Sequence, residues 1–154
     1  MTKLKSPRLR FLGNVTGLPI YLVSGELVRN TIDLDFTAGG NEGVYPTYVP
    51  PGEIWIDDAL HAFDRVATAL HEIVERDLMI HHGWSYDRAH DAALEIERSF
   101  RKGLLRDRPK VFDVKRVERA FVAWQKDRSK GTYPNKHEKQ LGREVDMILT
   151  KRVR

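Results

Sequence analysis

Residues 69–97 read ALHEIVERDLMIHHGWSYDRAHDAALEIE, and this stretch decides the fold. Apolar residues recur at helical spacing on both sides of Gly83, which is typical of two amphipathic helices. Glycine commonly ends a helix and serine commonly caps the next one, so Gly83 and Ser85 predict a tight turn between the two helices. We expect the first helix over about residues 59–80 and the second over about residues 86–101.

A short turn makes the two helices antiparallel neighbours, and this brings four polar side chains together. His71 and Glu75 are one helical turn apart in the first helix, so they point the same way. His90 and Glu97 are two turns apart in the second helix. Counted from Gly83, Glu75 lies at the height of His90 and His71 at the height of Glu97. The sequence therefore predicts one polar patch between the helices.

The residue types of this patch are those of a metal site. The chain has no cysteine, so a site must use histidine and carboxylate ligands, which favours zinc or another divalent transition ion. A hydrolytic zinc site needs three protein ligands and an open position for water. His71, Glu75 and His90 can supply the ligands, and Glu72 can act as the general base. Glu97 fits three roles: a fourth ligand, a partner of a ligand histidine, or a second base.

Two plainer interpretations compete with the metal site. The motif His71-Glu72-x-x-Glu75 fixes only three of its five positions, so it also occurs by chance on the charged flank of an ordinary helix. His90 lies in an alanine-rich apolar stripe, so it also fits a core histidine that is hydrogen-bonded to Glu75 or Glu97. The structural and the metal-binding interpretations share one geometry and differ in whether an ion lies between the groups.

The strand-like segment Ile54-Trp55-Ile56-Asp57, followed by the helix with His71-Glu72-x-x-Glu75, resembles the strand-then-helix arrangement of zincin-like metallopeptidases. The resemblance covers roughly residues 50–100 and implies zinc binding by His71, base function for Glu72 and a peptide or protein substrate. Glu75 stands where the family has its second histidine. His90 stands roughly where one branch of the family has a glutamate. The H-E-x-x-E segment is also similar to that of small uncharacterised bacteriophage and prophage proteins.

The remaining N-terminal part predicts a small β-sheet. Residues 18–23 and 27–36 are apolar or alternating and suggest a hairpin around a turn at 24–26. We expect a loop over 37–43, an irregular proline-broken stretch over 44–52, and a short strand over 53–57. Asp57 or Asp58 then suits the N-cap of the first long helix. The fold class is thus α+β, with a small N-terminal sheet packed on a helical hairpin and followed by basic C-terminal helices.

Charge divides the chain into two parts. Residues 101–154 contain 17 Lys/Arg and 7 Asp/Glu, a balance of +10, whereas residues 1–100 have a balance of −6. We predict a zincin-like domain over 1–103 and a basic helical extension over 104–154, with helices near 111–128 and 141–148. Such asymmetry favours a nucleic-acid-binding or virion-associated module that works through the basic helices, with the His/Glu patch purely structural. It also fits an ordinary solvated surface.

The rest of the composition limits the environment. The sequence lacks a run of about 18 apolar residues, so we expect no membrane span. The basic N-terminal residues 1–7 are not followed by an apolar segment, and a secretory signal is therefore not expected. A chain without cysteine suits a reducing compartment. We therefore expect a cytoplasmic protein of a bacterial or phage-infected cell.

Overall fold

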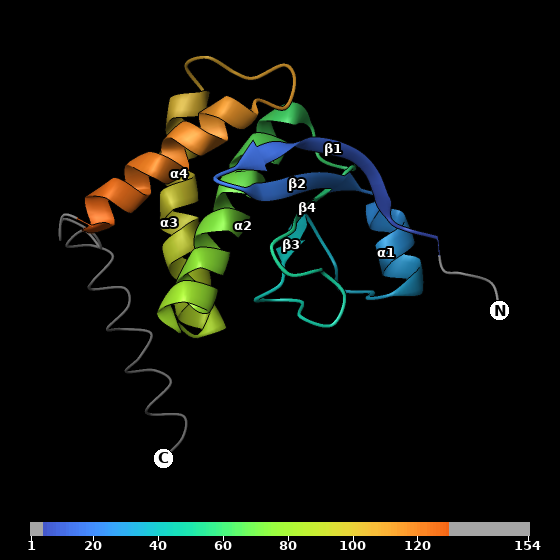
Figure 1. Ribbon diagram of the computed structural model, residues 1–154. Helices are drawn as coiled ribbons and strands as arrows, with labels where there is room; N and C mark the ends of the chain where they lie inside the picture. The colour runs from blue at the N-terminus through green and yellow to red at the C-terminus, as the bar shows by residue number, and fades with distance from the viewer. Residues whose placement is uncertain (1–4, 130–154) are drawn as a thin grey trace.

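The computed structural model describes residues 5–129 and confirms the α+β class (Figure 1). The elements follow in the order β1 (Arg8–Val15), β2 (Leu18–Val23), α1 (Gly25–Thr31), β3 (Gly39–Asn41), β4 (Ile54–Asp57), α2 (Ala62–His82), α3 (Tyr86–Leu104) and α4 (Val114–Ser129). No helix in the part of the chain described here is long and apolar enough to cross a bilayer.

The four strands form one mixed sheet in the order β1-β2-β4-β3. β1 pairs with β2 as an antiparallel hairpin, closed by Thr16 and Gly17, which both have positive φ. β2 and β4 are parallel, so the chain crosses over between them through α1, β3 and a long loop. β3 returns antiparallel to β4 and forms the outer edge of the sheet. This edge lies next to α2, which contacts both β3 and β4.

Alternation along the strands gives the sheet two apolar faces. Ile54 and Ile56 of β4 pack in the larger core with α2, α3 and α4, whereas Trp55 belongs to a smaller aromatic cluster with Phe36. Figure 1 shows the three long helices grouped on one side of the sheet, with α1 near its other end. The sheet is therefore covered on both faces, and α2 is the central helix of the larger core.

The helical hairpin confirms the local signals in the sequence. Gly83 ends α2 in the left-handed conformation, with φ of 67°, and the Ser85 side chain accepts a hydrogen bond from the Arg88 amide at the start of α3. The expected N-cap was wrong, because α2 begins at Ala62 after His61. Asp57 instead accepts from the Ala59 amide and pairs with an arginine of α1.

The third expected helix is α4, which packs against α2 and β1. Its Val117, Phe121 and Trp124 belong to the larger core. Its exposed charged side chains are the basic Lys115, Arg119 and Lys126 and the acidic Glu118 and Asp127. The helix expected near residues 141–148 lies outside the described residues.

Two predictions for the N-terminal part were wrong. Residues 25–31 form helix α1 rather than a strand, because the Ser24 side chain accepts from the Leu27 amide and so caps a helix instead of forming a hairpin turn. The alternation of Ile32, Leu34 and Phe36 had suggested a strand, but Leu34 is 80% exposed while Phe36 is fully buried. The expected loop over 37–43 contains strand β3, and β1 is a strand that was not predicted at all.

Candidate functional site

The centre of α2 carries three titratable side chains in a buried position. Every residue from 66 to 75 is buried, because this part of the helix is covered by the sheet on one side and by α3 on the other. His71, Glu72 and Glu75 are therefore all less than 8% exposed. Burial of such groups is costly unless they are paired, so their partners define the site.

Helix α3 supplies two of these partners at the heights expected from the sequence. His90 Nδ1 lies 2.8 Å from Glu75 Oε2, and His71 Nε2 lies 3.2 Å from the same oxygen. His71 Nδ1 lies 2.9 Å from Glu97 Oε1. The predicted meeting of these four side chains is confirmed, while their chemical roles stay predictions.

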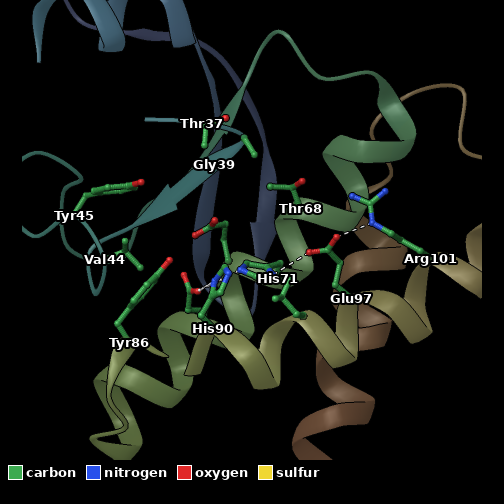
Figure 2. A pocket seen from close by; sticks show the side chains of 14 residues that line it. Thr37, Gly39, Val44, Tyr45, Thr68, His71, Tyr86, His90, Glu97 and Arg101 are labelled. Carbon is green, nitrogen blue, oxygen red and sulfur yellow. Dashed lines mark hydrogen bonds and ion pairs between the residues drawn. The ribbon is translucent and has the colours of Figure 1, made fainter. Parts of the chain in front are cut away.

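Figure 2 shows this row continuing from His71 through Glu97 to Arg101. Arg101 Nε donates to Glu97 Oε2 at 2.6 Å, and its Nη1 donates to Asp64 at 2.7 Å. Glu97 is thus held between a histidine and an arginine. Both oxygens of Glu97 are engaged, one of them on the His71 nitrogen that faces away from Glu75.

The close packing shifts the pKa values of the buried groups. Burial alone would lower the pKa of His71, but hydrogen bonds with Glu75 and Glu97 raise it to about 10. Burial would raise the pKa of Glu75, yet the hydrogen bonds with His71 and His90 lower it. Burial, followed by repulsion from Glu75, raises the pKa of Glu72. Without a bound ion the cluster therefore favours a positively charged His71 beside an ionised Glu75.

Asn41, at the end of β3, joins this cluster from the sheet. Its Nδ2 donates to Glu72 Oε2 at 2.7 Å and to Glu75 Oε1 at 3.1 Å. Sequence reasoning assigned Asn41 only to a loop and missed its contact with the site. The sequence offered one signal, because glycines surround Asn41 on both sides and indicate close packing of the backbone.

Gly39, two residues before Asn41, shows how closely the backbone of β3 packs against α2. A Cβ atom on Gly39 would lie 2.8 Å from the Trp55 carbonyl oxygen, 3.0 Å from Thr68 Cγ2 and 3.2 Å from Glu72 Cγ. Real Cβ atoms essentially never approach other atoms below 3.0 Å. Only glycine lets β3 pass this close to α2, and that closeness is what brings Asn41 to the two carboxylates.

The cluster opens into a cavity of about 280 Å³ between β3, α2 and α3 (Figure 2). Its walls combine the polar cluster with aromatic and small side chains: Thr37, Ala38, Gly39, Val44, Tyr45, Thr68, His71, Glu72, Glu75, Tyr86, His90, Leu94, Glu97 and Arg101. Tyr86 stacks on His90 with a ring separation of 5.2 Å and an interplanar angle of 28°. The cavity therefore gives a small molecule or a side chain access to the buried His71, the half-buried His90 and the carboxylates.

Three of the expected ligands form a group that could hold a metal ion. His71, Glu75 and His90 each offer a donor atom, and these atoms all lie within 4.8 Å of one another. Tetrahedral bonds of about 2.0–2.1 Å separate the ligand atoms by about 3.3 Å. The 3.2 Å between Glu75 Oε2 and His71 Nε2 is close to this separation, and the 2.8 Å between Glu75 Oε2 and His90 Nδ1 would have to widen by about 0.5 Å. Glu97 contacts the other nitrogen of His71 and leaves Nε2 facing Glu75, as a carboxylate behind a metal-ligating histidine does.

The other histidines among residues 5–129 lie away from this cluster. His82, in the last turn of α2, is 3.5 Å from Asp77, and His61 is an exposed residue at the start of the same helix. His137 lies outside the described residues. Tyr45 lines the cavity, whereas Tyr48 and Trp55 pack in the aromatic cluster behind it.

Comparison of the chain with models of protein families, with curated proteins and with solved structures finds no match. Function must therefore be argued from the site itself.

Proposed function

We propose that the chain is a zincin-like metal-dependent hydrolase that acts on peptides or proteins. The observation that carries this proposal is the convergence of the His71, Glu75 and His90 donor atoms at the wall of an open cavity. Three protein donors with space beside them are what a hydrolytic metal site requires, since a structural site closes its fourth position. Zinc, or another divalent transition ion, is the cofactor that this donor set favours.

Each residue around the donors has a chemical task in this proposal. A bound ion would supply Lewis-acid chemistry, the activation of water and the polarisation of a carbonyl oxygen. Glu72 lines the cavity beside the donors and acts as the proton acceptor, and it then returns the proton to the leaving amine. Glu97 keeps the His71 ring in the tautomer and orientation that leave Nε2 available.

A peptide substrate is supported by the edge strand. β3 forms the edge of the sheet in the part of the chain described here, and Gly39 together with the residues just before it lines the cavity. An extended peptide can pair with such an edge through backbone hydrogen bonds. Its carbonyl groups would then pass directly over the donor cluster.

The proposal is tested by metal analysis and by substitution. Purified protein, expressed in zinc-supplemented medium, is expected to contain stoichiometric metal. His71→Ala and Glu75→Ala should each lose it, while His61→Ala, which changes an exposed histidine of the same helix, should keep it. Glu72→Gln should keep the metal and abolish cleavage of a quenched fluorescent peptide library. Wild-type protein without metal, or Glu72→Gln with full cleavage activity, would refute the proposed enzyme.

A second candidate function rests on the surface formed by the last turn of α3, the segment that follows it and α4. Exposed cationic side chains follow one another there: Lys102, Arg106, Arg108, Lys110, Lys115, Arg119 and Lys126. Phosphate contacts require mainly surface cations, so this surface supports a nucleic-acid-binding or virion-associated role, with the His/Glu cluster structural. Binding to DNA or RNA that weakens steeply with salt would support this role, and no binding at about 50 mM salt would remove it.

A further inference from the structure

The Asn41 side chain makes polar contacts both with the loop after β3 and with the carboxylates of α2. It is fully buried, and its Nδ2 donates to one oxygen of Glu72 and one oxygen of Glu75. Its Oδ1 accepts from the backbone amides of Gly43 at 2.9 Å and Val44 at 3.3 Å. Both ends of the amide are therefore used, one on the loop after β3 and the other on the carboxylates of α2.

These contacts fix the direction of the amide. If the Asn41 group were turned over, its NH₂ would face the two backbone N–H groups and its oxygen would face the two carboxylates. Each of these contacts is repulsive, and in a buried position each unpaired group costs about 1–3 kcal/mol. The structure thus holds two N–H donors pointing at Glu72 and Glu75, where the loop amides keep them.

The Asn41 amide engages one oxygen of each carboxylate and leaves the other oxygen for a different partner. It takes Oε1 of Glu75, so only Oε2 of Glu75 faces His71 and His90. It also takes Oε2 of Glu72, which leaves Oε1 as the oxygen for proton transfer. Glu72 and Glu75 have the same side chain and lie three residues apart on one helix. Their chemistry alone therefore does not decide which of them binds the metal and which acts as the base.

We infer that Asn41 is a positioning residue that restricts Glu75 to a one-oxygen metal ligand and holds Glu72 outside the ligand set. This inference rests on the metal site proposed above. Without the amide, both oxygens of Glu75 are free to bind one ion, and Glu72 is free to become an additional ligand. The coordination number would then rise and the open position for water would be lost.

The test substitutes Asn41→Asp, which keeps the shape of the side chain and the acceptor for the loop amides but removes the donor. Asn30→Asp makes the same chemical change at an exposed position of α1 and serves as the matched control. The full chain is titrated with Co²⁺, whose visible absorption is strong in four-coordinate sites and weak at higher coordination. Zinc-loaded samples are examined by X-ray absorption, which distinguishes a carboxylate bound through one oxygen from one bound through two.

Asn41→Asp is expected to weaken the cobalt band and to add oxygen neighbours around zinc, whereas Asn30→Asp leaves both unchanged. Adding Glu72→Gln to Asn41→Asp restores an amide–carboxylate pair with the roles exchanged. The double variant keeps residue 72 paired but offers no donor to Glu75 Oε1, so it should recover the wild-type spectrum only in part, and a general loss of stability would not allow even that.

A wild-type cobalt spectrum in Asn41→Asp would overturn the inference and leave the metal site standing. If that variant does not fold, the wild-type zinc spectrum decides, since a carboxylate bound through both oxygens contradicts the role of Asn41. Wild-type protein that binds neither ion overturns the metal site itself, and the inference falls with it.

Discussion

Gly39→Ala is the change for which the structure gives the clearest expectation. The added Cβ would meet the Trp55 carbonyl oxygen at 2.8 Å, and this atom belongs to the backbone of a buried strand that cannot move aside. It would also press on Thr68 and on Glu72 Cγ, at 3.0 Å and 3.2 Å. Overpacking of this kind typically costs about 1–3 kcal/mol, and a backbone obstacle places Gly39→Ala in the upper half of that range.

For a chain of this size, each kcal/mol lowers Tm by about 2–4 °C, so thermal unfolding should shift by roughly 4–12 °C. Gly103→Ala is the control, because its Cβ meets nothing within 4 Å and alanine suits its helix; it should stabilise by about 0.5–1 kcal/mol. We also expect Gly39→Ala to lower turnover, since the added Cβ presses on Glu72 and moves β3, with Asn41, away from α2. Unchanged Tm in Gly39→Ala would refute the argument that β3 needs glycine to approach α2.

Three further predictions follow from the contacts and pKa shifts of the site and core. Glu97→Gln should weaken zinc binding about 10–100-fold without removing it, because it loosens the His71 ring but deletes no donor; isothermal titration checks this, and an unchanged affinity would count against its role. In EDTA, the protein should be less stable to urea at pH 9 than at pH 6.5. The stability that His71 contributes is complete below its unfolded pKa of 6.5 and is lost as pH rises through its folded pKa of about 10. Glu72, with its raised pKa, acts in the same direction, so equal stability at the two pH values would contradict the described pairing. Leu78→Ala should cost about 2–5 kcal/mol by urea unfolding, because this side chain is fully buried, while Ile80→Ala, at a 46% exposed position, should cost far less.

The helical hairpin and the meeting of its polar groups could be predicted because their signals are local. Gly83 and Ser85 mark the turn, and counting residues from it sets the heights of His90 and Glu97 against the first helix. The hydrogen bonds that form α-helices connect residues four apart, so a single stretch of sequence contains the whole pattern.

The sheet and the Asn41 contacts could not be predicted in the same way. Asn41 is 31 residues from Glu72 and 34 from Glu75, and only the pairing of β3 with β4 brings them together. Helix α1 was missed because Ser24 followed by glycine suits both a turn and a helix cap. In the structure the Ser24 side chain accepts from the Leu27 amide and so caps a helix, a role that the sequence interpretation did not give to this serine.

The charged row between α2 and α3 has a mechanical consequence. The buried side of α3 carries Ala89, Ala92 and Ala93 in its N-terminal half, where small side chains alone do little to fix the position of α3 along α2. A slip of α3 by one turn along α2 would break both contacts that join the two helices, His71 with Glu97 and His90 with Glu75, whereas the His71–Glu75 contact lies within α2 and would survive. These two contacts therefore set the register of α3 against α2. They would serve this structural task with or without catalysis.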